Sequence, residues 1–185
     1  MSSISSRVDV TLTNNTFIGN TTGGYGSTFL NTRGTLTLRN NIFVKGAPSV
    51  GACDSDTMYG GSLNDGGGNV RSGDSTCPGT TITPMLGTSG YYGGDVPTLP
   101  LLPGSGAFSV ATANCPATDA RGAARGATCD AGAFESQGFT LAKTSGDSQA
   151  AIINTAFTNP LSVSVTPVNA NDPVDGGMVV FTVPS

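Results

Sequence analysis

The sequence predicts an all-β protein in which part of a parallel β-helix, with its C-terminal cap, is followed by the beginning of a β-sandwich. Residues 10–19 return 26 residues later as residues 36–45, with five of ten positions identical, and a fixed period of this length is typical of stacked repeats. Charged residues make up only 11% of the chain, whereas 27 residues are glycine, a composition that favours strands and turns over helices. After residue 135 the repeat gives way to short alternating segments, which predict a second β-structure of another kind.

Each repeat is predicted to form a strand, a corner and a second strand. In residues 8–12, apolar residues alternate with polar ones at the two-residue period of a strand. Asn14 and Asn15 then form the corner, since asparagine tolerates the left-handed conformation that a tight bend requires. Phe17 is the next inward side chain, and the second copy repeats this plan up to Phe43. We therefore expect Phe17 to lie over Phe43.

Stacking the repeats predicts a ladder of asparagines at the corner. Asn41 follows Asn15 by one repeat, and a fainter third copy places Asn69 a further 28 residues on. Amide side chains in such a column can donate and accept hydrogen bonds along the stack, so all three asparagines are interpreted as structural. An antiparallel sandwich is the alternative fold. It explains the alternation but not the repeated Asn-Asn-x-Phe corner.

The four cysteines form two pairs that are local in sequence, Cys53 with Cys77 and Cys115 with Cys129. No two of them have the spacing of a zinc motif, and the chain contains no histidine, so we predict no metal site. Disulfides are the favoured interpretation; each would contribute about 3 kcal/mol on the chain-entropy model, and both imply an oxidising compartment. The alternative is four reduced thiols in a cytosolic protein.

Residues 1–7 contain no apolar core of a secretory signal, although disulfides require export from the cytosol. We therefore expect that Met1 is not the natural start and that the chain is an internal piece of a longer secreted protein. No segment approaches the roughly 18 apolar residues that span a bilayer, so no membrane span is predicted.

Two domains are expected, at 1–136 and 137–185. Residues 74–135 are interpreted as the last winding and the cap, because an uncovered terminal rung would expose apolar side chains and strand edges. The 49 residues of the second domain are about half of the ~100 in an immunoglobulin-like sandwich, so this domain is expected to be incomplete. Its strands are expected at 139–141, 161–165 and 178–183, with turn residues at 171–173 and 175–177.

The region 115–135 carries the pattern Asp-x-Arg-Gly-x-x-Arg followed by Cys-Asp-x-Gly-Ala-Phe-Glu. It resembles the C-terminal end of bacterial secreted or surface-exposed right-handed β-helix proteins of the choice-of-anchor type. Residues 138–184 are similar to the first half of a bacterial Ig-like repeat. The chain departs from the family at Ala120, where glutamine is usual, and at Ala124, where proline is usual. The resemblance implies a right-handed β-helix, an extracellular or cell-surface location, and a structural cap motif formed by Asp119, Arg121, Arg125, Asp130 and Glu135.

Several classes of chemistry are excluded by composition. Without histidine, Ser-His-Asp and Cys-His catalysis cannot operate in their usual forms, and no glycine-rich phosphate loop is present, so no cofactor is predicted. A glycosidase needs two facing carboxyl groups, and the only glutamate, Glu135, belongs to the cap pattern. A net charge of −4 with scattered basic residues excludes a nucleic-acid partner.

Two interpretations of single residues remain open in the sequence. Arg121 and Arg125 either bind the carboxylate of a uronic acid, which suits the guanidinium fork, or tether the cap to the end of the β-helix. Tyr91 and Tyr92, between glycines, either stack on a sugar ring or cover the apolar edge of the cap.

The sequence therefore predicts a non-enzymatic part of an extracellular or cell-surface scaffold or adhesin-like protein of a bacterium. Its expected partner is a cell-surface glycan or a protein ligand. The chain is expected to be continuous with further rungs and Ig-like repeats, and to act as a stalk if binding lies elsewhere. The alternative is the substrate-binding C-terminal end of a carbohydrate-active β-helix enzyme, a polysaccharide lyase or glycosidase with its catalytic rungs upstream.

Overall fold

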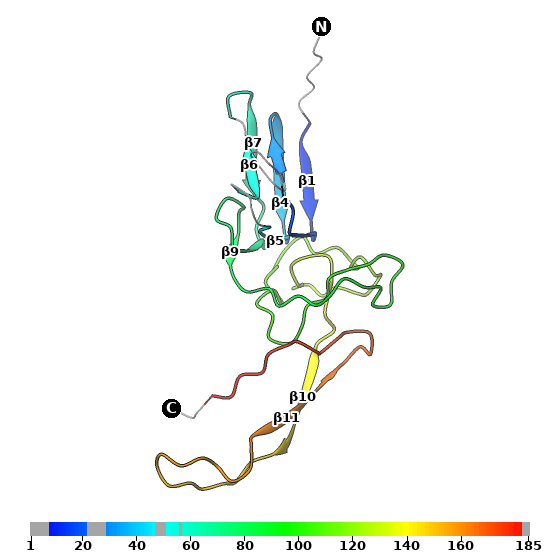
Figure 1. Cartoon of the computed structure of the whole chain (residues 1–185). Coiled ribbons are helices and arrows are strands. Elements are labelled where there is room, and N and C mark those ends of the chain that lie inside the picture. Colours follow the sequence, from blue (N-terminus) through cyan, green and yellow to red (C-terminus); the bar gives the residue numbers. More distant parts are fainter. Residues whose placement is uncertain (1–7, 22–28, 47–50, 56, 183–185) are drawn as a thin grey trace.

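Regular structure in this protein consists of β-strands. The computed structural model describes residues 8–21, 29–46, 51–55 and 57–182, and this described part contains no helix. Figure 1 shows side-by-side strands toward the N-terminus, an irregular body in the middle, and a long hairpin toward the C-terminus. The prediction of an all-β class is confirmed.

The repeats pair in parallel, each strand lying beside its copy from the next repeat. Val10 aligns with Leu36, and Phe17 with Phe43, so these strands of the first two repeats pair at the 26-residue period of the sequence. The third repeat pairs at slightly longer spacings, as Ile42 does with Val70. In the described residues, the parallel sheets are β1 (Val10–Thr13), β4 (Gly34–Arg39) and β7 (Gly61–Asp65); β2 (Thr16–Ile18), β5 (Ile42–Val44), β8 (Val70–Ser72) and β9 (Thr80–Thr81); and β3 (Phe29–Asn31) with β6 (Cys53–Ser55).

An asparagine with positive φ turns the chain between the first two strands of each of the first two repeats. Asn14 has φ 54° and Asn40 has φ 53°, a conformation that asparagine tolerates better than most residues. The third repeat has Gly68 at this place, with φ 69°. A Cβ atom on Gly68 would lie 2.1 Å from the Asn40 side-chain oxygen, so the third repeat has no room for the asparagine of the first two.

The inward side chains of the stacked strands form an apolar core. Leu38 and Phe43 are fully buried, and Leu36 is nearly so. The rings of Phe17 and Phe43 stack with centroids 5.5 Å apart and planes 7° apart, and Phe29 meets Phe17 edge-on at 4.8 Å. Each fully buried side chain of this size contributes roughly 1.5–3 kcal/mol, so the aromatic stack is a main source of cohesion between repeats.

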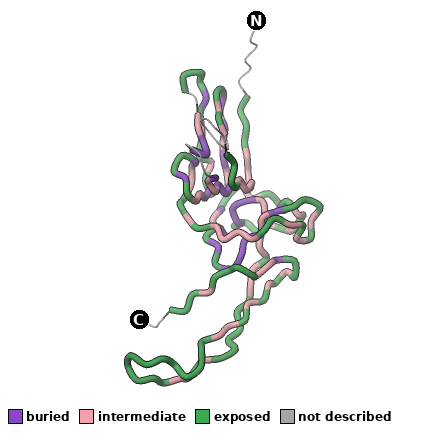
Figure 2. Tube along the Cα trace, viewed as in Figure 1, coloured by how far each residue is buried: buried purple, intermediate pink, exposed green. Residues whose placement is uncertain are grey.

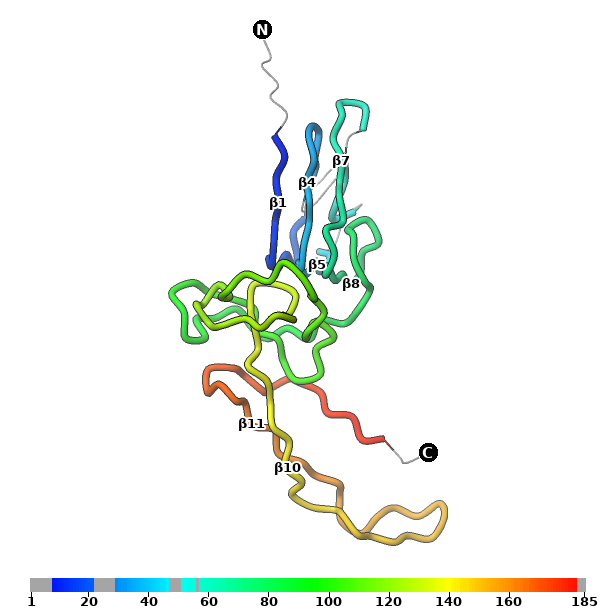
Figure 3. The backbone as a smooth tube through the Cα atoms, turned by 180° about the vertical axis from the view of Figure 1, so that it is seen from behind, coloured from blue at the N-terminus to red at the C-terminus, as the bar shows by residue number. Residues whose placement is uncertain are grey.

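The irregular body, residues 82–136, packs on the corners of the repeats and follows β9 in the chain. It contains no β-strand, and its loops are joined by single antiparallel residue pairs such as Ala111 with Cys129. Asn14 Nδ2 donates to the Asp130 carbonyl oxygen at 2.9 Å, and Gly132 N donates to Asn40 O at 2.8 Å. The body therefore contacts successive repeats, and Figure 3 shows it lying across one end of β1, β4 and β7.

The hairpin consists of β10 (Phe139–Ser145) and β11 (Ser162–Pro167), paired antiparallel. Leu141 lies opposite Val165 and Ala142 opposite Ser164, so one face is mainly apolar and the other is small and polar. Figure 2 shows that most of the hairpin is exposed, whereas the buried segments belong to the repeats and the body.

The prediction of a further strand at 178–183 was wrong for its described part. Residues 178–182 form no strand, and Val183 lies outside the described residues. Met178 N donates to Pro103 O at 2.8 Å, while Val180 and Phe181 are exposed. A strand needs a neighbouring strand to satisfy its backbone groups, and among the described residues this segment lies against the body instead.

Candidate functional site

Six charged side chains meet where the body joins the C-terminal segment, and we call them the charge network. Five of them belong to the cap pattern found in the sequence, whereas Asp172 was singled out only as a turn residue. The five of these side chains that form ion pairs are between 0% and 8% exposed. The members are Asp119, Arg121, Arg125, Asp130, Glu135 and Asp172.

Arg121 is the centre of the network. Its Nε donates to Asp119 Oδ2 at 2.9 Å, and its Nη1 donates to Asp172 Oδ1 at 3.0 Å and to the Tyr92 carbonyl oxygen at 3.2 Å. The guanidinium carbon lies 3.5 Å from the centroid of the Phe134 ring, a cation–π arrangement. One buried side chain thus joins three segments that are distant in the sequence.

Arg125 and Glu135 form the second half of the network. Arg125 Nη1 donates to Glu135 Oε2 at 2.6 Å, and Arg125 Nη2 donates to Gly132 O at 2.8 Å. Glu135 Oε2 also accepts from Asp130 N at 2.9 Å. The Asp130 carboxylate accepts from the backbone of Ser109 and of Ser136, at 2.8 Å each, so it fixes two loops of the body.

The network holds four carboxylates against two guanidinium groups, and burial affects their protonation. Loss of solvation raises the pKa of Glu135 to about 7, against the opposing effect of the Asp130 backbone N–H and of Arg125. Burial likewise raises the pKa of Asp130, although two backbone N–H groups and Arg125 oppose this. Hydrogen bonds from backbone N–H groups favour the ionised form of these buried carboxylates and so offset part of the effect of burial.

The geometry of the network is that of a structural tether. The side chain of Arg121 is 2% exposed and that of Arg125 is 1% exposed, so neither guanidinium faces solvent to bind a uronic acid. Among the described residues, Arg125 Nε is the network's one buried nitrogen or oxygen atom without a hydrogen-bond partner. Breaking one partner of such a buried pair is costly because it leaves the other charge uncompensated.

The corner asparagines form two columns. In the outer column, Asn15 N donates to Asn41 Oδ1 at 2.9 Å, and Asn41 N donates to Asn69 Oδ1 at 3.0 Å. The amide Nδ2 atoms of Asn15 and Asn41 donate to the same oxygens. In the inner column, which we did not predict, Asn40 Nδ2 donates to Asn14 Oδ1 at 3.2 Å. The identical Asn-Asn pair in both copies was the sequence signal for it.

Both predicted disulfides are present and leave no free cysteine. Cys53–Cys77 joins the end of one winding to the loop before β9, and Cys115–Cys129 closes a loop of the body. Cys77 and Cys129 are fully buried. Asp74, unremarkable in the sequence, supports the first bridge because its carboxylate accepts from Ala52 N at 2.7 Å.

Tyr91 and Tyr92 have different environments. Tyr91 is 66% exposed. The Tyr92 ring meets Phe134 edge-on with centroids 6.1 Å apart, and its hydroxyl donates to Thr88 O at 2.8 Å. Tyr92 therefore covers an apolar side chain of the body, as one of the two interpretations proposed, and it also lines a cleft.

The chain matches no protein-family model, no curated protein and no solved structure. Across the described residues, no three or more histidine, cysteine, aspartate or glutamate side chains are grouped so as to hold a metal ion. In the same part of the chain, no helix has the length and hydropathy to cross a membrane.

Proposed function

We propose that this chain is a non-enzymatic part of an extracellular or cell-surface scaffold or adhesin-like protein. In this proposal, residues 1–136 are rungs and cap of a right-handed parallel β-helix of a bacterial surface protein. Residues 137–185 begin an Ig-like sandwich. The observation that carries the proposal is the register of the repeats, in which strands one repeat apart pair in parallel in three separate sheets.

That register is what a wound chain of constant period requires. Each of the first two windings supplies one strand to every parallel sheet, and like residues stack on like, as Phe17 does on Phe43. Such stacks are stabilised by contacts between neighbouring repeats and can be extended without limit. They provide a long, stiff support, which suits a scaffold.

The two disulfides support the proposed location. The two bridges link residues 24 and 14 positions apart in the sequence, and cross-links over such distances stabilise a fold by about 3 kcal/mol each on the chain-entropy model. Disulfides persist in oxidising compartments. A secreted or surface-exposed protein is therefore the favoured setting.

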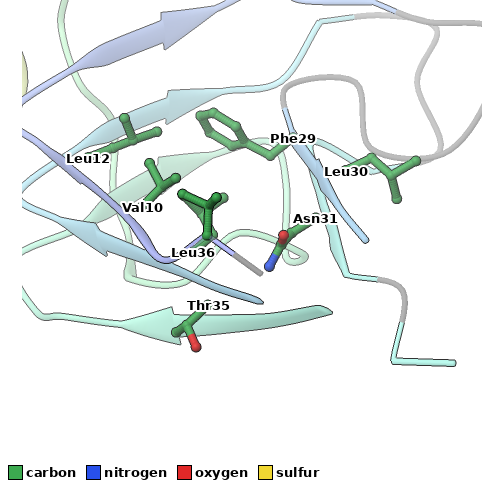
Figure 4. A pocket seen from close by; sticks show the side chains of 8 residues that line it. Val10, Leu12, Phe29, Leu30, Asn31, Thr35 and Leu36 are labelled. Carbon is green, nitrogen blue, oxygen red and sulfur yellow. The ribbon is translucent and has the colours of Figure 1, made fainter. Parts of the chain in front are cut away.

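The first described winding supports continuation by further rungs. Among the described residues, β1, β2 and β3 each pair with one neighbour, and residues at β1, β3 and β4 line a hollow of about 420 Å³. Figure 4 shows Val10, Leu36 and Phe29 gathered in this hollow. A mainly apolar hollow beside the unpaired edges of β1 and β3 is the surface that another rung of the same kind would cover.

The carbohydrate-active enzyme is the weaker candidate for the described residues. Glu135 is 6% exposed and bonded to Arg125, and the other buried carboxylates serve the backbone of the body. A pair of carboxyl groups facing a substrate is not formed by the charge network.

The proposal is tested by a thiol count and an activity assay on the chain exported to a bacterial periplasm. We expect no reactive thiol before or after unfolding, and no release of reducing ends from pectic, chitinous or cellulosic polysaccharides. Four reactive thiols, with circular dichroism unchanged by reductant, would refute the extracellular setting. Polysaccharide cleavage by the purified chain would refute the non-enzymatic role.

A further inference from the structure

We propose that the cleft between the body and the turn after β11 binds a saccharide, and that it prefers neutral or amino sugars to acidic ones. This deepens the adhesin-like function proposed above by assigning a ligand class, and it rests on that function for its biological setting. The cleft has a volume of about 590 Å³, within the usual range for small-molecule sites.

One wall of the cleft is formed by residues 86–92, which are held in shape by backbone pairing with residues 98–101. Gly90 and Thr98 exchange two N–H···O bonds of 3.0 and 2.8 Å, and Leu86 bridges to Leu101. The Tyr92 hydroxyl donates to Thr88 O at 2.8 Å and lies 3.5 Å from Thr88 Oγ1. These bonds fix the side chains of Thr88 and Tyr92, which both line the cleft.

The opposite wall is the turn at 172–177. Gly177 N donates to Val174 O at 3.1 Å, and Met178 N donates to Pro103 O at 2.8 Å, which ties the turn to the body. Pro173 and Asp175 from this turn line the cleft. The Asp175 side chain has no hydrogen bond or ion pair with any described residue, so its carboxylate is available to a ligand.

Arg121 holds the two walls at a fixed separation. Its Nη1 donates both to the Tyr92 carbonyl oxygen, in the first wall, and to Asp172 Oδ1, in the second. This guanidinium is 2% exposed, so solvent does not compete for these bonds. A cleft whose walls are already fixed loses less entropy on binding than a mobile one.

The lining suits the surface of a sugar ring. Leu86, Leu102 and Pro173 supply the apolar part of the lining, which accommodates the C–H faces of a pyranose. The Thr88 hydroxyl can donate and accept, the Tyr92 hydroxyl can accept because its proton is donated to Thr88 O, and the Asp175 carboxylate accepts strongly from hydroxyl or ammonium donors. Apolar contact with a few placed polar groups is the usual composition of a small-ligand site.

Charge decides the preference among sugars. Asp175 is the one charged side chain in the lining, and the chain carries a net charge of −4. A uronic acid would bring a second carboxylate beside Asp175 and be repelled, whereas the ammonium group of a glucosamine unit would be attracted. Neutral hexoses retain the hydroxyl contacts.

The test is isothermal titration of the whole chain with trimers of glucosamine, N-acetylglucosamine and galacturonic acid. We expect the glucosamine trimer to bind most tightly and the galacturonate trimer not to bind. D175N should weaken the glucosamine complex about tenfold, the usual loss for a hydrogen bond to a charged group. D95N is the matched control, because Asp95 is exposed, bears the same charge and does not line the cleft.

Three results would overturn the site: no saccharide binding by the disulfide-bonded chain, equal loss in D175N and D95N, or preference for galacturonate. Because this assay uses the purified chain, its failure leaves the scaffold function standing. A thiol count that refutes the extracellular setting would not alter the binding data.

Discussion

Among single residues, Glu135 has the strongest conflict between burial and charge. Its pKa lies at about 7, above the ordinary 4.5, chiefly because burial removes solvent. The folded state therefore binds the Glu135 proton more tightly than the unfolded state, and stability falls as pH rises between about 4.5 and 7. In E135Q the pH-dependent contribution of Glu135 to the free energy of unfolding, at most about 3 kcal/mol, should vanish. Urea unfolding of both proteins across this pH range measures the difference.

The control for this pH effect is D147N. Asp147 is exposed, and its pKa is lowered by Lys143, so any contribution it makes is lost only as pH falls below the ordinary range of a carboxyl group. Between pH 4.5 and 7, the free energy of unfolding of D147N should change with pH as it does in the unmodified chain. Equal slopes in E135Q and the unmodified chain would show that the Glu135 carboxylate is ionised throughout.

Asn41 should be the most costly asparagine of the outer column to lose. It is fully buried, its side-chain oxygen accepts from Asn15, and its Nδ2 donates to Asn69 Oδ1 and to Leu12 O. N41A should lower the free energy of unfolding by about 2–3 kcal/mol, because buried backbone and amide groups lose their partners. The exposed Asn64 makes one long hydrogen bond to Thr37, so N64A should change stability by less than about 0.5 kcal/mol.

At the scale of elements, the corner glycine of the third repeat carries the next prediction. Gly67 and Gly68 both have positive φ, so alanine at either position bears the cost of a left-handed conformation, about 1–2 kcal/mol. A Cβ at Gly68 would in addition collide with Asn40, whereas a Cβ at Gly67 meets nothing within 4 Å. G68A should therefore be less stable than G67A by about 1–3 kcal/mol in thermal unfolding. Equal melting temperatures would show that Asn40 moves aside freely.

The repeats could be read from the sequence because their signal is local and periodic. Asn15, Asn41 and Asn69 recur at one corner, and the structure joins them by hydrogen bonds over 26 and 28 residues. Asp172 could not be found in this way, since its partner Arg121 is 51 residues distant and no pattern links them. The segment at 178–182 alternates like a strand, but alternation cannot supply the neighbour that a strand requires.

At the scale of the whole molecule, the body binds the repeats on one side and the hairpin on the other. The inner asparagines attach the repeats, through Asn14 to Asp130 O, and the network attaches the C-terminal segment, through Asp172 to Arg121. The hairpin itself is mostly exposed. Its position relative to the body therefore depends on a few buried polar contacts more than on apolar burial.

Removing the Asp172 carboxylate should release the C-terminal segment while leaving the repeats folded. Asp172 is 2% exposed and accepts from Arg121 and from Gln137 N at 2.8 Å, so D172A leaves a buried guanidinium short of a partner, at a cost of about 3–5 kcal/mol. Hydrogen exchange followed by mass spectrometry should show faster exchange in the described residues after 137. Protection of β4 and β5 should be unchanged.

D175A alters the same turn at an exposed carboxylate without a partner and should exchange like the unmodified chain. Because local opening reports the stability of each unit separately, uniform loss of protection in D172A would instead show that the repeats, body and hairpin unfold together.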